Sequence, residues 1–246
     1  MQKRLFLFLF FNFSIVYYIV GQNLKPIGTW TSHMSYKVGT SVTTDGTLIY
    51  CGTTTGLFTY NTLDNSISTY STTNLLNGVD IQKVTYSAEY STLIIVYENG
   101  NIDLISNGIT TNVPFIAQSV EVQNSVNEIK LKNNFAYLSF GFGIVVLDIQ
   151  KKEITDTYRF NTGSQEISVH STEIKGDTIY AATERGLFSG RLNTNLLDFN
   201  AWTKSKFQDG SSIQKLFLAD NNLILVTQKS GLDSAFVQEN NSYRYL

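Results

Sequence analysis

The sequence predicts an all-β protein assembled from repeated four-stranded units. Hydrophobic residues make up 42% of the 246 residues and aromatic residues 13%, whereas charged residues make up only 15%. Apolar runs rich in β-branched and aromatic residues favour strands, and the Asn and Gly residues between them favour tight turns. The repeated segments show no helical period of 3.6 residues. This combination points away from helical solenoids, coiled coils and disordered chains.

An internal repeat indicates the architecture. Five segments share an apolar strand, a short turn with a glycine, and a second apolar strand, and their aligned glycines are spaced by 44, 43, 43 and 45 residues. Strand-built repeats of this length are typical of propeller blades with four strands each. We therefore expect a β-propeller with about five blades present. The aligned glycines are Gly56, Gly100, Gly143, Gly186 and Gly231.

Each unit is expected to contain the same elements in the same order. A first strand, such as 81–87 or 213–219, leads through a polar turn into the two hairpin strands. These inner strands are nearly all apolar because neighbouring blades cover both of their faces. The hairpin glycine supplies a positive φ at the tight turn. A polar, alternating fourth strand, such as 67–70 or 202–206, closes the unit on the solvent side.

Two further segments have the character of outer strands. Residues 29–33 precede the first complete unit, and residues 240–246 follow the third strand of the last one. Propellers often close by using an N-terminal strand as the outer strand of the last blade. Here residues 240–246 already supply an outer strand for the last unit. We therefore expect the N-terminal part of a larger propeller, with a closed five-bladed ring as the alternative.

The N-terminus has the pattern of a secretory signal peptide. Lys3 and Arg4 precede an apolar run over residues 5–20, and Gly21 offers a small residue for cleavage before Gln22. The alternative is a membrane anchor, but this run is shorter than the roughly 20 residues that span a bilayer. We expect a signal peptide over residues 1–21 and a propeller over residues 22–246.

The composition and motifs favour a protein that is not an enzyme. The net charge of −2 gives no electrostatic reason to expect nucleic acid as a partner. Cys51 is the only cysteine, so no internal disulfide forms, and its apolar surroundings suggest a core residue. His33 and His170 lack other ligands at metal-binding spacing, so we expect no metal site and no cofactor. Channel carboxylates at Asp80 and Glu128 would be needed for a propeller hydrolase, but solvated turn carboxylates are far commoner.

The turns between the second and third strands are the best candidates for binding. In a propeller these turns gather on one face near the channel, where cationic groups and an exposed aromatic ring could hold an anionic sugar. Ordinary solvated turns are the alternative. Trp30 and Trp202 fall at equivalent outer-strand positions, where we expect them to cap the core. The candidate binding residues are Arg185, Lys229, Glu98, Asn99 and Phe142.

Four stretches, 27–36, 97–105, 135–158 and 179–188, are similar to the N-terminal propeller of the PorZ family of the type IX secretion system. The resemblance implies a subunit on the outer face of the outer membrane, in a complex with the sortase-like PorU and the barrels PorV and PorQ. It also implies binding of anionic lipopolysaccharide and its presentation to the sortase for cargo anchoring. Residues 52–78 also resemble the propeller repeat of periplasmic sensors in two-component systems, which leaves a ligand-sensing receptor propeller as the alternative.

Overall fold

The computed structural model of the protein describes residues 34–114, 125–163, 165–207, 211–229, 232–239 and 242–246. Residues 34–246 form one compact unit. The expected signal peptide and Trp30 lie outside the described residues. In the described part of the chain, no helix is long and apolar enough to cross a membrane.

Five antiparallel four-stranded sheets follow one another along the chain. The first holds β1 (Gly39–Thr44), β2 (Leu48–Thr53), β3 (Leu57–Asn61) and β4 (Ile67–Tyr70). The second holds β5 (Ile81–Ser87), β6 (Thr92–Tyr97), β7 (Ile102–Ser106) and β8 (Ile109–Val113). The third holds β9 (Val126–Lys132), β10 (Phe135–Phe140), β11 (Gly143–Asp148) and β12 (Glu153–Arg159).

The fourth sheet holds β15 (Val169–Lys175), β16 (Thr178–Thr183), β17 (Gly186–Arg191) and β18 (Thr203–Lys204). The fifth holds β19 (Ile213–Ala219), β20 (Asn222–Lys229), β21 (Leu232–Glu239) and β22 (Ser242–Tyr245). A small hairpin of β13 (Asn161–Thr162) and β14 (Gln165–Glu166) connects the third sheet to the fourth, and the 3-10 helix η2 (Phe199–Ala201) precedes β18.

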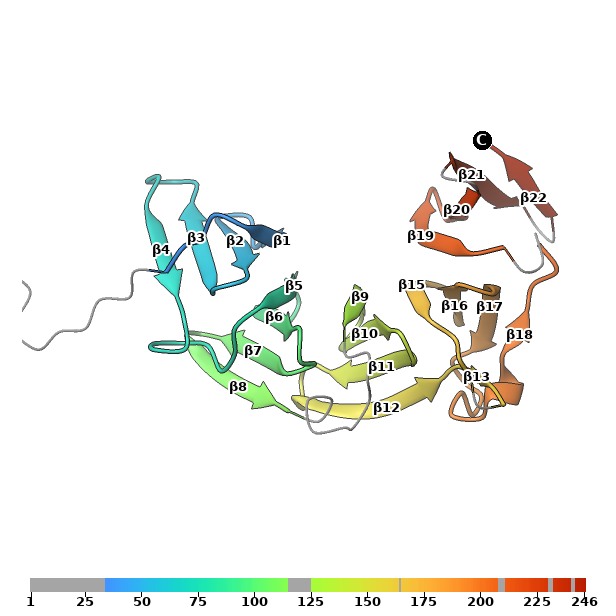
Figure 1. Cartoon of the computed structure of the whole chain (residues 1–246), viewed down its shortest axis with the longest axis horizontal. Coiled ribbons are helices and arrows are strands. Elements are labelled where there is room, and N and C mark those ends of the chain that lie inside the picture. Colours follow the sequence, from blue (N-terminus) through green and yellow to red (C-terminus); the bar gives the residue numbers. More distant parts are fainter. Residues whose placement is uncertain (1–33, 115–124, 164, 208–210, 230–231, 240–241) are drawn as a thin grey trace, which may run out of the picture. The chain divides into compact units, whose positions relative to one another are not determined.

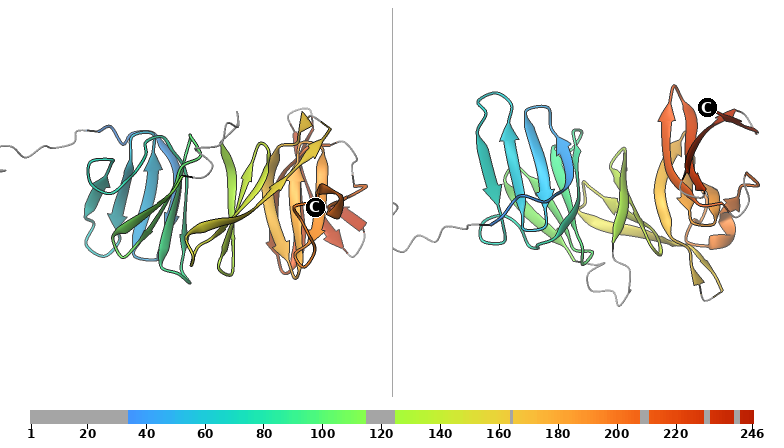
Figure 2. Two further views of the ribbon diagram at one scale, coloured as in Figure 1. Left: turned by 90° about the horizontal axis from the view of Figure 1, so that it is seen from below. Right: turned by 45° about the horizontal axis from the view of Figure 1, so that its top comes forward.

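These sheets confirm the expected propeller fold of four-stranded blades. Within each sheet, every strand pairs with the next one in sequence, and the first strands β1, β5, β9, β15 and β19 lie side by side along the inner edges of the blades (Figure 1). Figure 2 shows the strands of each blade running in alternating directions between two ends. We call the five sheets blades 1 to 5 in chain order.

Several predicted strand limits are confirmed to the residue, including 81–87, 213–219 and 67–70. The fourth strand predicted over residues 202–206 is shorter and covers only Thr203–Lys204. The strand begins one residue later than predicted because η2 extends to Ala201 and Trp202 forms its C-cap. The Asp198 side chain caps that helix by accepting from Asn200 N, and the Trp202 amide donates to Phe199 O.

The turns between first and second strands explain why Asn, Gly and Asp recur there. Every one of them contains a residue with a positive φ, a conformation that Gly and Asn adopt most readily. Of the hairpin glycines that the structure describes, Gly100, Gly143 and Gly186 have the expected positive φ, whereas Gly56 does not and is instead required because a Cβ there would clash with the Tyr70 carbonyl. Gly143 has a φ of 148° and a Cβ there would clash with the Tyr158 carbonyl. In the five turns between first and second strands, the positive-φ residues are Gly46, Ser91, Asn133, Gly176 and the pair Asp220–Asn221.

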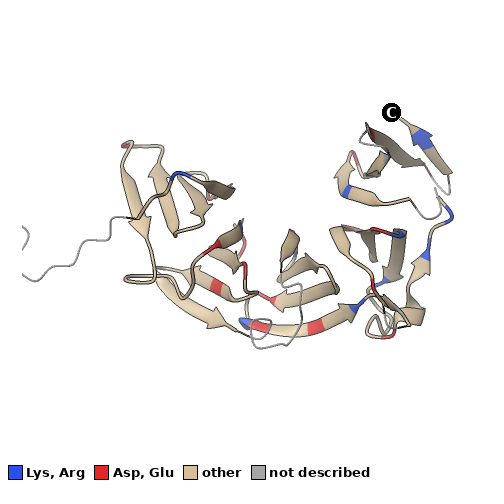
Figure 3. Ribbon diagram, viewed as in Figure 1, with Lys and Arg blue, Asp and Glu red and all other residues tan. Residues whose placement is uncertain are grey.

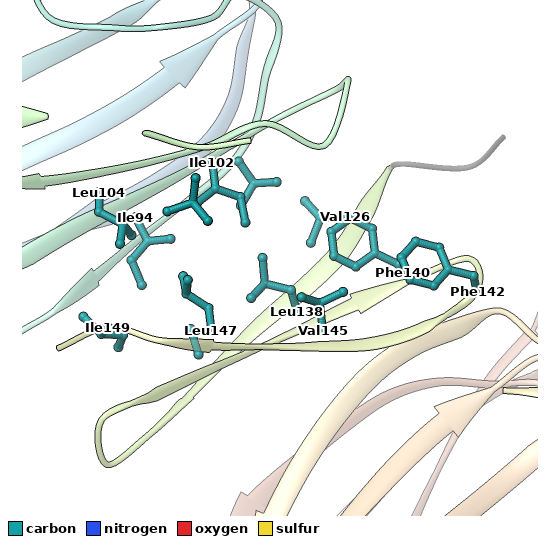
Figure 4. Packing of buried hydrophobic residues seen from close by; sticks show 13 residues of the cluster. Ile94, Ile102, Leu104, Val126, Leu138, Phe140, Phe142, Val145, Leu147 and Ile149 are labelled. Carbon is teal, nitrogen blue, oxygen red and sulfur yellow. The ribbon is translucent and has the colours of Figure 1, made fainter. Parts of the chain in front are cut away.

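The core lies between successive blades. Strands β6 and β11 are buried along their whole length, because each contributes one face to the preceding gap and the other to the following gap. Figure 4 shows this packing between blades 2 and 3, where Ile94 and Leu104 of blade 2 face Leu138 and Leu147 of blade 3. Trp202 fills the equivalent gap between blades 3 and 4, and its indole N–H donates to Leu196 O at 3.1 Å. Its expected role as a cap of the core is confirmed.

Candidate functional site

The first strands share one irregularity at the end where the predicted binding turns lie. Each has a β-bulge at its second residue, which leaves that residue unpaired within its own sheet. In blade 2, for example, Ile81 pairs with Tyr97, the last residue before the turn that carries Glu98 and Asn99. We call this end of the blades the bulge end. The bulged residues are Thr40, Gln82, Asn127, His170 and Gln214.

The bulged side chains hydrogen-bond to the next blade. Asn127 Nδ2 donates to Val169 O at 2.7 Å, and His170 Nδ1 lies 2.9 Å from Ile213 O. Because a carbonyl only accepts, His170 Nδ1 carries a proton, and this side chain has a structural role. Thr40 contacts Ile81 O in the same way, and Gln82 accepts from Val126 N.

The residue after the bulge also reaches the next blade. Ser41 and Ser171 accept from the amides of Val84 and Leu216, at 3.1 and 2.9 Å. Glu128 accepts from the amide of Thr172 and forms an ion pair with Lys215. Glu128 therefore links blade 3 to both blade 4 and blade 5.

A second ion pair joins β9 to β15. Lys130 Nζ lies 2.7 Å from Glu173 Oε2, and the Glu173 side chain is only 2% exposed. Its other oxygen accepts from the Ile174 amide. The ion pairs of Glu128 and Glu173 thus join the first strand of one blade to that of another.

Two of the predicted binding residues do lie together in an open pocket. Glu98 and Asn99 form the exposed tip of the β6–β7 turn and line a pocket of about 520 Å³ with the loop before β5. Asp80 faces the same pocket, and its carbonyl accepts from the Glu98 amide at 2.9 Å. With two carboxylates and no cationic lining residue, this pocket suits hydroxyl groups better than an anion. The lining residues are Thr72, Asn77, Gly78, Val79, Asp80, Glu98 and Asn99.

Arg185 lies at the bulge end of blade 4. Its guanidinium donates to Gln165 Oε1 at 2.7 Å, and its Nε lies 4.0 Å from a carboxylate oxygen of Glu184. The side chain is 38% exposed, so part of the cation faces solvent. Lys229 ends β20 at the same end of blade 5, and its side chain lies outside the description.

Phe142 does not have the exposed position that the sequence suggested. It is 3% exposed, and its ring stacks on Phe140 with centroids 5.2 Å apart. The Arg159 guanidinium covers it at 5.5 Å from the ring centroid. The expectation of an exposed Phe142 is therefore wrong, because this turn folds its aromatic ring back into the gap between blades 2 and 3.

Cys51 is half-buried on β2, not fully buried as expected. Burial raises the pKa of its thiol, which keeps it in the less reactive protonated form. Within the described ranges, no three His, Cys, Asp or Glu side chains come close enough to hold a metal ion. Figure 3 shows positively and negatively charged residues spread along the described part of the chain.

The sequence model of one protein family, described as the N-terminal β-propeller domain of PorZ in the type IX secretion system, matches residues 49–203. The chain belongs to this family. Within the PorZ family, the solved structure of PorZ from Porphyromonas gingivalis is similar, with a TM-score of 0.78 and 22% identity. The match covers 89% of this chain and 29% of that one, so the chain spans less than a third of the length of PorZ from P. gingivalis.

Extracellular domains of proposed hybrid two-component systems from B. thetaiotaomicron are also similar. Two of them have TM-scores of 0.61 and 0.63, with 16% and 15% identity. The matches cover 80% and 87% of this chain, and 27% and 30% of theirs. At such identities the likeness concerns the fold. None of the curated proteins matches the chain.

Proposed function

We propose that the chain is a non-enzymatic propeller subunit of the type IX secretion system and acts at the cell surface. The observation that carries this proposal is membership in the PorZ N-terminal propeller family over residues 49–203. The P. gingivalis relative is described as an essential bacterial surface component of that system. The satisfied inner-strand carboxylates Glu128 and Glu173 support a scaffold role, because each is engaged in holding blades together.

By the same proposal, the partners are the sortase-like PorU and the outer-membrane barrels PorV and PorQ. The task of the propeller would be to bind anionic lipopolysaccharide and present it to the sortase. Arg185 and Lys229 would contact the anionic groups, since both lie at the bulge end of neighbouring blades. Glu98 and Asn99 would accept hydrogen bonds from sugar hydroxyls in the pocket that they line in blade 2.

Deleting the gene in the bacterium that encodes it tests the secretion role. We expect type IX cargo to be lost from the cell surface, as measured by surface proteolysis and immunoblotting of cells and medium. Expression of the gene from a plasmid should restore surface cargo. Normal surface attachment of cargo in the deletion strain would reject the role.

A charge-reversal variant tests the glycan contact separately. Arg185→Glu combined with Lys229→Glu should weaken binding of anionic lipopolysaccharide about tenfold at low salt, and less at high salt, because exposed charges are screened. Binding would be measured by surface plasmon resonance on immobilised lipopolysaccharide.

The matched control is Lys151→Glu with Arg191→Glu, which makes the same change in charge at the opposite end of the blades. This control should bind as the wild type does. Equal weakening in both double variants would show a general charge effect and remove Arg185 and Lys229 from the site.

A ligand-sensing receptor propeller is the second candidate, favoured by the fold shared with the extracellular domains from B. thetaiotaomicron. The two candidates differ in what deletion changes. A sensor predicts altered transcription of a small gene set with normal cargo attachment. A secretion subunit predicts lost cargo attachment without a specific change in transcription.

A further inference from the structure

A second cleft lies between blades 1 and 2, and its lining includes the turn residues Ser91, Asn107 and Gly108 at the end opposite the bulge end. It has a volume of about 420 Å³ and opens beside the β7–β8 turn. Its lining is largely apolar, and none of the lining residues carries a charge. The lining residues are Leu48, Tyr50, Leu57, Tyr70, Leu75, Tyr86, Ser91, Leu93, Ile105, Asn107 and Gly108.

Three tyrosines distinguish this cleft. Tyr50 of β2 and Tyr86 of β5 stack across the gap between the blades, with ring centroids 5.9 Å apart and planes 10° apart. Burial raises the pKa of Tyr50, as does its 2.7 Å hydrogen bond to Asp45, and the nearby phenols of Tyr86 and Tyr70 add to this. Tyr70 of β4 lines the same cleft as these two rings.

The cleft depends on a departure from the repeat. The position of Tyr86 in β5 is occupied by Leu131, Ile174 and Leu218 in the first strands of blades 3, 4 and 5. Those aliphatic residues pack into the cores between blades. Only in blade 2 does this strand place a phenol there, and all three tyrosines of the cleft are only half-buried.

Several polar groups of the cleft have no hydrogen-bond partner among the residues that the structure describes. They are the hydroxyls of Tyr70, Tyr86 and Ser91 and the side-chain amide of Asn107. Apolar walls with a few convergent polar groups are the usual make-up of a small-molecule site, and the volume falls within the range of such sites. A cavity of about 150 Å³ already holds a benzene ring, so this cleft has room for two or more rings.

We propose that this cleft binds an uncharged ligand with a planar apolar body and one hydrogen-bonding group. The body inserts between Leu57, Leu93 and the Tyr50–Tyr86 stack, and the polar group bonds to the phenol of Tyr86. An ionised ligand is disfavoured because the lining offers no opposite charge to offset its desolvation. This site is separate from the lipopolysaccharide contact of the proposed function and does not depend on it.

Binding of N-phenyl-1-naphthylamine to the full chain tests the proposal. This probe is uncharged, carries two aromatic groups and an N–H, and increases in fluorescence when it leaves water. We expect saturable binding to one site per chain. Leu48→Trp, which fills the cleft with a larger ring, should weaken binding at least tenfold.

Tyr86→Phe tests the polar contact without changing the volume. It should weaken binding about two- to tenfold, since one hydrogen bond is lost. Tyr180→Phe is the matched control, because Tyr180 occupies the position of Tyr50 in blade 4, against blade 5. Circular dichroism would verify that each variant folds. If Leu48→Trp does not fold, the affinity of Tyr86→Phe alone tests whether the probe binds in this cleft.

Three outcomes would overturn the proposal. One is the absence of saturable binding to the wild-type chain. Another is wild-type affinity in a folded Leu48→Trp variant or in Tyr86→Phe. The third is a loss in Tyr180→Phe as large as that in Tyr86→Phe, which would place the probe elsewhere.

Discussion

Asp103 is a carboxylate without solvent contact in the middle of an apolar strand, β7. Such a group is costly to bury unless donors surround it. Tyr97 Oη donates to it at 2.6 Å, Asn112 Nδ2 at 2.7 Å, and both the amide and the side chain of Asn77 at 2.8 and 3.0 Å. The network ties the loop before β5 to the β7–β8 hairpin. It thereby holds the wall of the pocket that Glu98 and Asn99 line.

Tyr97 couples this network to pH. Its burial, together with the hydrogen bond to Asp103, raises the pKa of its phenol well above the ordinary value of 10. The unfolded chain deprotonates first, so the stabilisation is complete below about pH 10 and is lost as the pH rises from there toward the folded-state pKa.

Tyr97→Phe should lower the free energy of unfolding by about 1–3 kcal/mol at neutral pH, because Asp103 loses a donor. It should also make the loss of stability above pH 10 less steep. Urea unfolding at several pH values measures both effects. Tyr245→Phe, at a phenol that is 64% exposed, is the control at neutral pH and should change little. A variant with the alkaline slope of the wild type would show that Tyr97 does not contribute to it.

At the scale of elements, the first strands are joined by side chains as well as by packing. A bulged residue contacts the backbone next to the following bulge, and the residue after it accepts from the amide two positions after that following bulge. The same offset recurs from blade to blade, so the hydrogen bonds keep successive blades in register. The bulges have a structural purpose, since each frees one side chain to reach sideways.

Ser171→Ala should loosen the contact between blades 4 and 5. Ser171 is fully buried, and its removal leaves the Leu216 amide without its partner at 2.9 Å. We expect a loss of about 1–3 kcal/mol in unfolding free energy and faster hydrogen exchange at the Leu216 amide. Ser68→Ala, at an exposed position of the outer strand β4, should have almost no effect. Unchanged exchange at Leu216 would contradict the clasp.

At the scale of the whole molecule, five blades repeat one plan and differ in what they place at their two ends. Blade 2 contributes to both pockets, whereas blades 3 to 5 use their inner strands to hold one another. A subunit that acts at the cell surface must leave the cytoplasm. Processing of the N-terminus is therefore a test of the proposed function.

The mature protein should begin at Gln22, because the apolar run over residues 5–20 is followed by the small residue Gly21. Mass spectrometry of the N-terminal peptide from purified envelope would show this. A Leu9→Asp variant, with a charge in the apolar run, should stay unprocessed in the cytoplasm. Surface protein that still begins at Met1 would refute the signal peptide.

Much of the fold was predictable because local patterns encode it. The spacing of the hairpin glycines indicated five blades, and the position before each hairpin marked first strands such as 81–87 to the residue. Turn residues with a positive φ marked the ends of strands. The candidate site was predictable in part: Glu98 and Asn99 are exposed turn residues, as their polarity suggested, and Asp103 could have been noticed as a lone acid in an apolar strand.

The sequence by itself thus determined the repeated blade, several of its strand limits and the family, since each depends on residues close together in the chain. Only the tertiary structure decided which side chains face solvent and which meet across a gap between blades. Phe142 is buried because Phe140 and Arg159 enclose it, and Glu128 is engaged because Lys215, 87 positions away, reaches it. The cleft of Tyr50 and Tyr86 likewise exists only where two blades meet. Such contacts depend on how sheets pack, and hydrophobic periodicity along one strand carries no information about the strand that it will face.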